Sequence, residues 1–155
     1  HVEQKGSLVD NLKTRFDFSH TKPISNDEIH KIESIVNNEI LTNKVTTTEM
    51  MSIDKAKESG ALMLFGEKYD SEVRVLNIGN SIELCGGTHV RNTGDIGLFK
   101  IYSETGVASG VRRIEGVTGL NLIKFLNDQE EILTKVSKDL NTKPSEIPTK
   151  VSSLL

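Results

Sequence analysis

The sequence has a single cysteine among its 155 residues, and one cysteine cannot form a disulfide within the chain. Nothing therefore indicates a secreted, disulfide-held protein, and a cytoplasmic location is expected. Long apolar runs are also lacking. The longest, ALMLF at 61–65, is far short of the roughly 20 residues that span a bilayer. The first residues carry no signal-peptide pattern, so membrane involvement is not expected.

An excess of positive charge is missing too. The net charge of -3 excludes nucleic-acid binding through overall charge, although a local basic patch stays compatible with it. There is no internal repeat and no low-complexity segment. The length suits one domain of ordinary size. The chain opens without methionine, and helical spacing continues to its last residue, Leu155, so a fragment of a longer protein is expected.

Apolar spacing and turn residues predict the elements of the first half. Residues 1–20 are typical of a hairpin, and 44–50 has the β-branched content of a strand. Ser25 with Glu28 forms a capping box ahead of an amphipathic helix at about 26–41.

In the following residues, predicted helices and strands alternate irregularly. A short helix over 52–60, ended by Gly60, precedes a strand at 72–79. A strand pair is predicted at 95–104 and 110–119. Together these elements predict an α+β fold, with a mixed or antiparallel sheet packed with helices.

From Leu120 the pattern is helical, and a break at Lys143-Pro144 followed by a second helical stretch predicts a C-terminal helical hairpin. A narrow stripe is typical either of a coiled coil or of a helix packed on its own domain. The stripe consists of Leu122, Leu126, Gln129, Leu133, Val136 and Leu140.

The stretch ELCGGTHV places Cys85 four positions before His89. An ionised thiol and a neutral imidazole both bind zinc, and one loop can deliver this spacing to a single ion. Gly86 and Gly87 between them favour a tight, exposed turn. Two ligands make half of a zinc site. Two alternatives are a small buried cysteine and a nucleophilic Cys85 with His89 as its base, which needs a third, orienting group.

Several motifs, in this order, closely resemble the editing region of the bacterial alanyl-tRNA synthetase family. They are HVEQKGSLV, RFDFSH, ALMLFGEKYD, ELCGGTHV, RNTGDIGLFKI and SGVRRIEGVTG. The resemblance implies that 1–119 is an editing, or second additional, domain. It implies that 120–155 is the truncated start of the helical linker to a C-terminal domain. A threonyl-type domain, in which CRGPH usually surrounds the cysteine, and a free-standing editing protein are the alternatives.

The resemblance implies a hydrolase that cleaves mischarged Ser-tRNA(Ala) and Gly-tRNA(Ala) at a zinc held by an HxxxH pair and a C-x3-H pair. Cys85 and His89 match the second pair. The first pair lies upstream of the stretch matching HVEQKGS, so the zinc site is expected to be incomplete and the chain alone weak or inactive. The parent enzyme of this family ligates alanine to tRNA(Ala) using ATP.

Further candidates follow from the same resemblance and from the residues. Gln4 matches a glutamine of the family's editing pocket and is expected near the substrate or terminal adenosine. From the residues themselves, Thr88 is expected to orient water or the ester, Gly110 to permit close backbone approach, and Arg112 or Arg113 to meet a phosphate of the tRNA acceptor end. If 110–119 is a strand, the two arginines face opposite ways, and the one facing away from the site is solvated or paired with a carboxylate such as Glu115. The expected partners are tRNA(Ala) and the remaining synthetase domains, with neither DNA nor membrane. The rival interpretation is a non-catalytic module that docks the acceptor end or serves a structural role.

Overall fold

A computed structural model describes residues 2–63 and 69–155 of the chain. His1, part of the apolar run at 61–65 and part of the ALMLFGEKYD motif lie outside the described residues. The chain divides into two compact units, His1–Gly119 and Leu120–Leu155, which are described separately.

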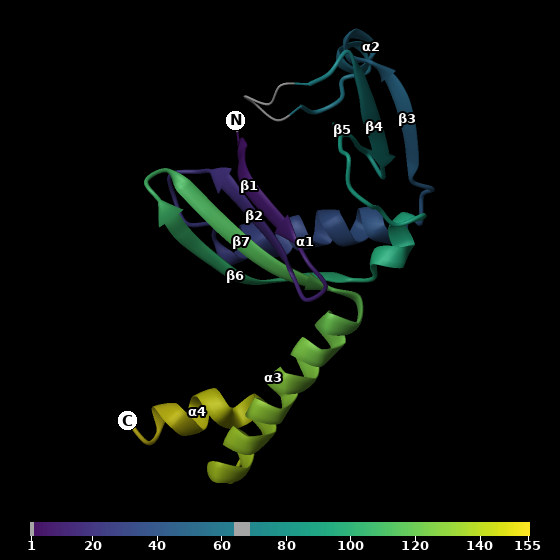
Figure 1. Ribbon diagram of the computed structural model, residues 1–155. Helices are drawn as coiled ribbons and strands as arrows, with labels where there is room; N and C mark the ends of the chain where they lie inside the picture. Colours follow the sequence, from purple (N-terminus) through teal and green to yellow (C-terminus); the bar gives the residue numbers. More distant parts are fainter. Residues whose placement is uncertain (1, 64–68) are drawn as a thin grey trace. The chain divides into compact units, whose positions relative to one another are not determined.

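The first unit contains a four-stranded antiparallel sheet in the order β1-β2-β7-β6 (Figure 1). Its strands are β1 (Gln4–Val9), β2 (Thr14–Ser19), β6 (Phe99–Ala108) and β7 (Val111–Thr118). The predicted N-terminal hairpin is confirmed as β1 and β2. Its turn is fixed by Asp10, whose carboxylate accepts from the backbone N–H groups of Leu12 at 2.7 Å and Lys13 at 2.8 Å.

The predicted strand at 95–104 is wrong at its start. Residues Thr93–Ile96 form a 3-10 turn, η1, and β6 begins only at Phe99. The carboxylate of Asp95 accepts from the N–H of Asn92 at 3.0 Å, which closes this turn. Gly97 then adopts a φ of 72°, a left-handed conformation that a strand does not use.

Helix α1 (Asn26–Leu41) begins at the predicted capping box, in which the Ser25 hydroxyl accepts from the Glu28 N–H and the Glu28 side chain accepts from the Ser25 N–H. Buried Glu33 ties the helix to the sheet edge. Its carboxylate accepts from the Ile101 N–H at 2.8 Å and from Lys100 Nζ at 2.9 Å. These bonds hold α1 against β6, and the helix lies along one side of the four-stranded sheet (Figure 1).

A second sheet, in the order β3-β4-β5, is also antiparallel. It consists of β3 (Thr47–Ser52), β4 (Glu72–Ile78) and β5 (Ser81–Leu84), and α2 (Ile53–Glu58) packs on it. A small apolar core joins helix and sheet, made of Ala56, Ala61, Val73 and Val75.

Three of the elements predicted from the sequence concern this second sheet. The helix predicted at 52–60 and the strand predicted at 72–79 are confirmed as α2 and β4, and Gly60 follows α2 with a φ of 76°. The strand predicted at 44–50 is shifted, because residue 45 forms only an isolated bridge to Asn92 and β3 begins at Thr47. Strand β5 was not predicted. The predicted α+β class is confirmed, with its strands divided between two sheets.

The second unit carries α3 (Gly119–Asp139), η2 (Pro144–Glu146) and α4 (Ile147–Ser152), as the helical prediction required. Helix α3 ends before the proline, because Asn141 takes a left-handed φ of 48°. Along the predicted stripe Leu122 is buried, whereas Leu126 is 48% and Leu133 is 50% exposed, so the choice between coiled coil and domain packing stays a prediction. No described helix is long and apolar enough to cross a membrane.

Candidate functional site

The candidate site is the loop that follows β5. Strands β4 and β5 are joined at Gly79-Asn80, where Gly79 has a φ of 62°. Their register pairs Val75 with Leu84, and the N–H of Cys85 donates to the Arg74 carbonyl at 3.2 Å. The hydrogen-bond ladder between β4 and β5 therefore continues one bond beyond the end of β5, and the loop starts after that bond.

The loop brings the predicted pair together. A methyl group placed on Gly87 would lie 3.6 Å from Cys85 Sγ and 3.6 Å from His89 Nε2, so both atoms lie around one point. Gly86 and Gly87 are exposed, as expected. Neither takes a left-handed φ, so neither glycine is required by backbone conformation. Gly87 leaves open the space beside the two ligand atoms, whereas a methyl group on Gly86 would meet nothing within 4 Å.

The imidazole of His89 has an unsatisfied buried atom. Its Nε2 is buried and has no hydrogen-bond partner among the described residues. Buried polar atoms are nearly always bonded, so such an atom requires an explanation. A nitrogen and a free thiol that face one small volume fit half of a tetrahedral zinc site. Within residues 2–63 and 69–155, no group of three or more His, Cys, Asp or Glu side chains could complete it.

Sequence reasoning missed Arg74 of β4. Its Nη1 donates to the carbonyl of Cys85 at 2.9 Å and to that of Gly87 at 2.6 Å. The alternation in EVRVLNI contained a signal, because Val73 and Val75 face the core and a strand turns the residue between them to the opposite face. An arginine there, one strand before a glycine-rich loop, can reach that loop's carbonyls.

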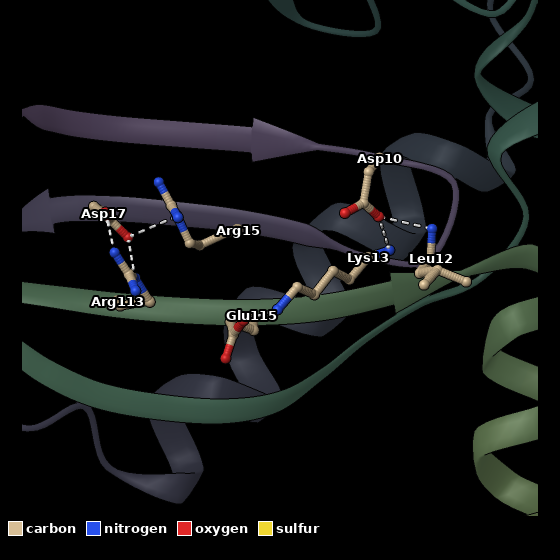
Figure 2. Close-up of polar contacts among 7 residues, drawn as sticks. All are labelled: Asp10, Leu12, Lys13, Arg15, Asp17, Arg113 and Glu115. Atoms are coloured by element: carbon tan, nitrogen blue, oxygen red, sulfur yellow. Dashed lines mark hydrogen bonds and ion pairs between the residues drawn. The ribbon is translucent and has the colours of Figure 1, made fainter.

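The two candidate arginines of β7 are both engaged in fork-like ion pairs. Arg112 donates through Nε and Nη2 to Glu104, both at 2.5 Å. Arg113 donates to Asp17 at 2.7 and 2.8 Å, as Figure 2 shows. Pairing with a carboxylate, expected for one of the two arginines, is found for both. The carboxylate is not that of Glu115, the example given, because Glu115 accepts from Lys13 Nζ at 2.6 Å.

These pairs have electrostatic consequences. The hydrogen bonds from Arg113 lower the pKa of Asp17, and those from Arg112 lower the pKa of Glu104, because each guanidinium stabilises the ionised carboxylate. Nε of Arg15 also lies 3.6 Å from Oδ1 of Asp17 (Figure 2). A role of Arg112 or Arg113 at a phosphate stays a prediction.

The remaining candidates lie on separate elements. Gln4 is exposed on β1, and its Nε2 donates to Ser7 Oγ at 3.2 Å. Gly110 sits in the turn between β6 and β7 with a φ of 69°, and its carbonyl accepts from the His20 N–H at 3.0 Å. Thr88 is exposed within the loop. In the described part of the chain, no hydrogen bond links Gln4 or Gly110 to the loop.

Comparisons with known proteins match part of the first unit to a described domain family. Residues 73–115 match the family described as the threonyl and alanyl tRNA synthetase second additional domain. That span contains Arg74, Cys85 and His89.

Curated relatives match over the full chain. They include alanine–tRNA ligases of Aromatoleum aromaticum, 58% identical over 155 residues, and of Nitrosospira multiformis and Albidiferax ferrireducens, each 56% identical over 155 residues. The match covers 100% of this chain and 18% of the length of each of these ligases. Over its whole length the chain is therefore similar to a segment of alanine–tRNA ligases, and that segment contains a match to the second additional domain.

Proposed function

We propose that this chain is the editing part of an alanine–tRNA ligase and hydrolyses the ester of Ser-tRNA(Ala) and Gly-tRNA(Ala). One observation carries the proposal: the buried, unpartnered Nε2 of His89 lies beside Cys85 Sγ around the open space at Gly87. The relatives' name and the matched domain family support a place within an alanine–tRNA ligase, and the hydrolytic role is what the resemblance of the motifs implies.

The need for such a site follows from selectivity. A synthetic pocket that accepts alanine disfavours an analogue with one added hydroxyl by only about 10²-fold, and glycine is smaller and simply enters. A second, hydrolytic site that hydrogen-bonds the serine hydroxyl penalises alanine there, because polar groups of the site are left unpaired.

Within this proposal Cys85 and His89 are metal ligands, and further ligands come from residues outside this chain. Zinc held by these residues would supply Lewis acidity, for activating water or orienting the ester. Exposed Thr88, between the two ligands, is placed to hydrogen-bond water or the ester. Gln4 contacts the substrate or terminal adenosine, and Arg112 and Arg113 lie near the acceptor end.

The wider context belongs to the proposal as well. The partners are tRNA(Ala) and the other domains of the ligase, and the parent protein joins alanine to tRNA(Ala) using ATP in the cytoplasm.

The proposal is tested by the rates at which Ser-tRNA(Ala) and Ala-tRNA(Ala) are hydrolysed with zinc supplied. Two proteins are compared, this chain and the chain extended upstream to include the HxxxH pair. We expect the extended protein to cleave the serine ester and to spare the alanine ester, and this chain to be weak or inactive. Cleavage by neither protein would favour a docking or structural module instead. Equal cleavage by both would show that Cys85 and His89 do not need the upstream pair.

A further inference from the structure

We infer that Arg74 is a positioning residue that holds Cys85 and His89 in their metal-binding arrangement; this rests on the proposed metal role of that pair. Arg74 contacts the loop at three points. Its carbonyl accepts from the Cys85 N–H at 3.2 Å, and its Nη1 donates to the carbonyls of Cys85 at 2.9 Å and Gly87 at 2.6 Å.

The geometry explains why one side chain can do this. Since Val75 pairs with Leu84, the next position of the ladder sets Arg74 opposite Cys85. Opposed residues of an antiparallel pair direct their side chains to the same face, so the guanidinium lies on the side of the sheet toward which Cys85 projects. Its Nη1 carries two hydrogens and bridges the carbonyls on both sides of Gly86.

The loop needs such a restraint. Two consecutive glycines give the unrestrained backbone more freedom than any other pair of residues. A methyl group on Gly86 would meet nothing within 4 Å, so packing does not fix the chain there. The Arg74 bridge therefore fixes the carbonyl directions on which the separation of Cys85 Sγ from His89 Nε2 depends. Groups that orient metal ligands are typically worth about 10- to 100-fold in metal affinity.

An effect of charge and an effect of positioning predict opposite changes in metal affinity when Arg74 is replaced by glutamine. Removing a cation near a divalent metal strengthens metal binding if charge alone matters. Removing the bridge weakens it if position matters. Arg74→Gln loses both charge and bridge, whereas Arg74→Lys keeps the charge and loses the planar fork. Arg91→Gln removes a guanidinium two residues beyond His89 that makes no hydrogen bond or ion pair to the loop among the described residues, and serves as the matched control.

The experiment uses the 155-residue chain and Co²⁺ alone as the probe. Titration is followed by the thiolate-to-metal absorption band, and NMR order parameters of Gly86 and Gly87 are measured without metal. We expect Arg74→Gln and Arg74→Lys to weaken Co²⁺ binding about 10- to 100-fold and Arg91→Gln to leave it within about twofold. The glycine order parameters should fall from the rigid range, about 0.85, to below about 0.6 in both Arg74 variants.

The outcomes separate the inference from the function on which it rests. If the unaltered chain gives no thiolate band, its two ligands are too few to hold Co²⁺ without the upstream pair, and the order parameters alone then decide whether Arg74 orders the loop. If the unaltered chain binds Co²⁺ and Arg74→Gln binds it equally tightly or more tightly, the inference that Arg74 positions the ligands is overturned. Unchanged order parameters overturn it too. If both Arg74 variants unfold, as judged by circular dichroism, Arg74 is a stabilising residue of the sheet and the inference is wrong.

Discussion

The four-stranded sheet and the loop after β5 treat polar side chains in opposite ways. On the sheet, Arg113 and Asp17 satisfy each other in a fork, and Lys13 bonds to Glu115 (Figure 2). In the loop, His89 keeps a buried ring nitrogen without a partner, close to the free thiol of Cys85.

The difference teaches how to separate structural from functional polar residues. A guanidinium that forks onto the carboxylate of a neighbouring strand contributes to the sheet, and it does so through two of its five N–H donors. A buried atom without a partner is costly in a folded chain, by about 1–3 kcal/mol, and a ligand that bonds to it offsets that cost. Arg15 Nε on β2 is also buried without a hydrogen bond, but it lies 3.6 Å from Oδ1 of Asp17 in an ion pair. What distinguishes His89 Nε2 is the free thiol of Cys85 beside the same open space, and for that reason the loop is the candidate site.

The largest expected effect is functional. His89→Ala in the full-length ligase should lower Ser-tRNA(Ala) hydrolysis by about 100-fold or more, because it removes a metal ligand. In metal-free protein its melting temperature should hardly change, since the removed Nε2 bonds to no described group. Deacylation kinetics and calorimetry check both parts, with His30→Ala on the exposed face of α1 as the control. A large loss of stability with unchanged hydrolysis would show that His89 is a structural residue rather than a functional one.

The next effect lies on the structural side. Glu33→Ala should destabilise the chain by about 2 kcal/mol, because the buried Ile101 N–H and Lys100 Nζ lose their acceptor. Glu33→Gln should cost less, since an amide oxygen still accepts from Ile101. Urea unfolding measures both, with exposed Ser34→Ala as the control. Equal midpoints for all three variants would show that this carboxylate does not tie α1 to the sheet.

Acid should weaken the ion pairs of the four-stranded sheet. Asp17 and Glu104 have pKa values lowered from 3.8 and 4.5, so their stabilisation is complete above those values and is lost as pH falls through the lowered pKa of each. The urea midpoint should therefore drop most steeply below about pH 4. Glu104→Gln should flatten that drop. An equally steep drop in Glu104→Gln would show that protonation of Glu104 does not cause the loss of stability in acid.

The smallest effect distinguishes the two glycines. A methyl group at Gly87 would touch Cys85 Sγ and His89 Nε2 at ordinary contact distance, so Gly87→Ala should keep stability and weaken Co²⁺ binding by a few fold. The methyl group of Gly86→Ala meets nothing within 4 Å, which makes it the matched control. Equal Co²⁺ affinity of the two variants would show that the space at Gly87 does not serve the metal.

Much of the fold could be predicted from local signals. The capping box at Ser25, the apolar spacing of α1 and the turn residues of the first hairpin depend on neighbours in sequence, and each is confirmed. The start of β6 could not be predicted, because Asp95 closes a local turn within a stretch that reads as strand. The short β5 was missed because its four residues precede glycines and give a weak period.

The site was predictable in part for a similar reason. Cys85 and His89 lie close in sequence, so their spacing alone indicated that they could meet. Partners across strands are set by register, which the sequence does not state. That is why Glu115 was assigned to an arginine, whereas the sheet gives it to Lys13, and why Arg74 was not considered.

The most direct test of the central claim is a zinc measurement on two proteins, this chain and the full-length ligase, each with and without His89→Ala. We predict weak zinc binding by this chain, tight binding by the ligase, and loss of that tight site in its His89→Ala variant. Tight, stoichiometric zinc in this chain alone would contradict a half-site, and unchanged zinc in the ligase variant would contradict His89 as a ligand.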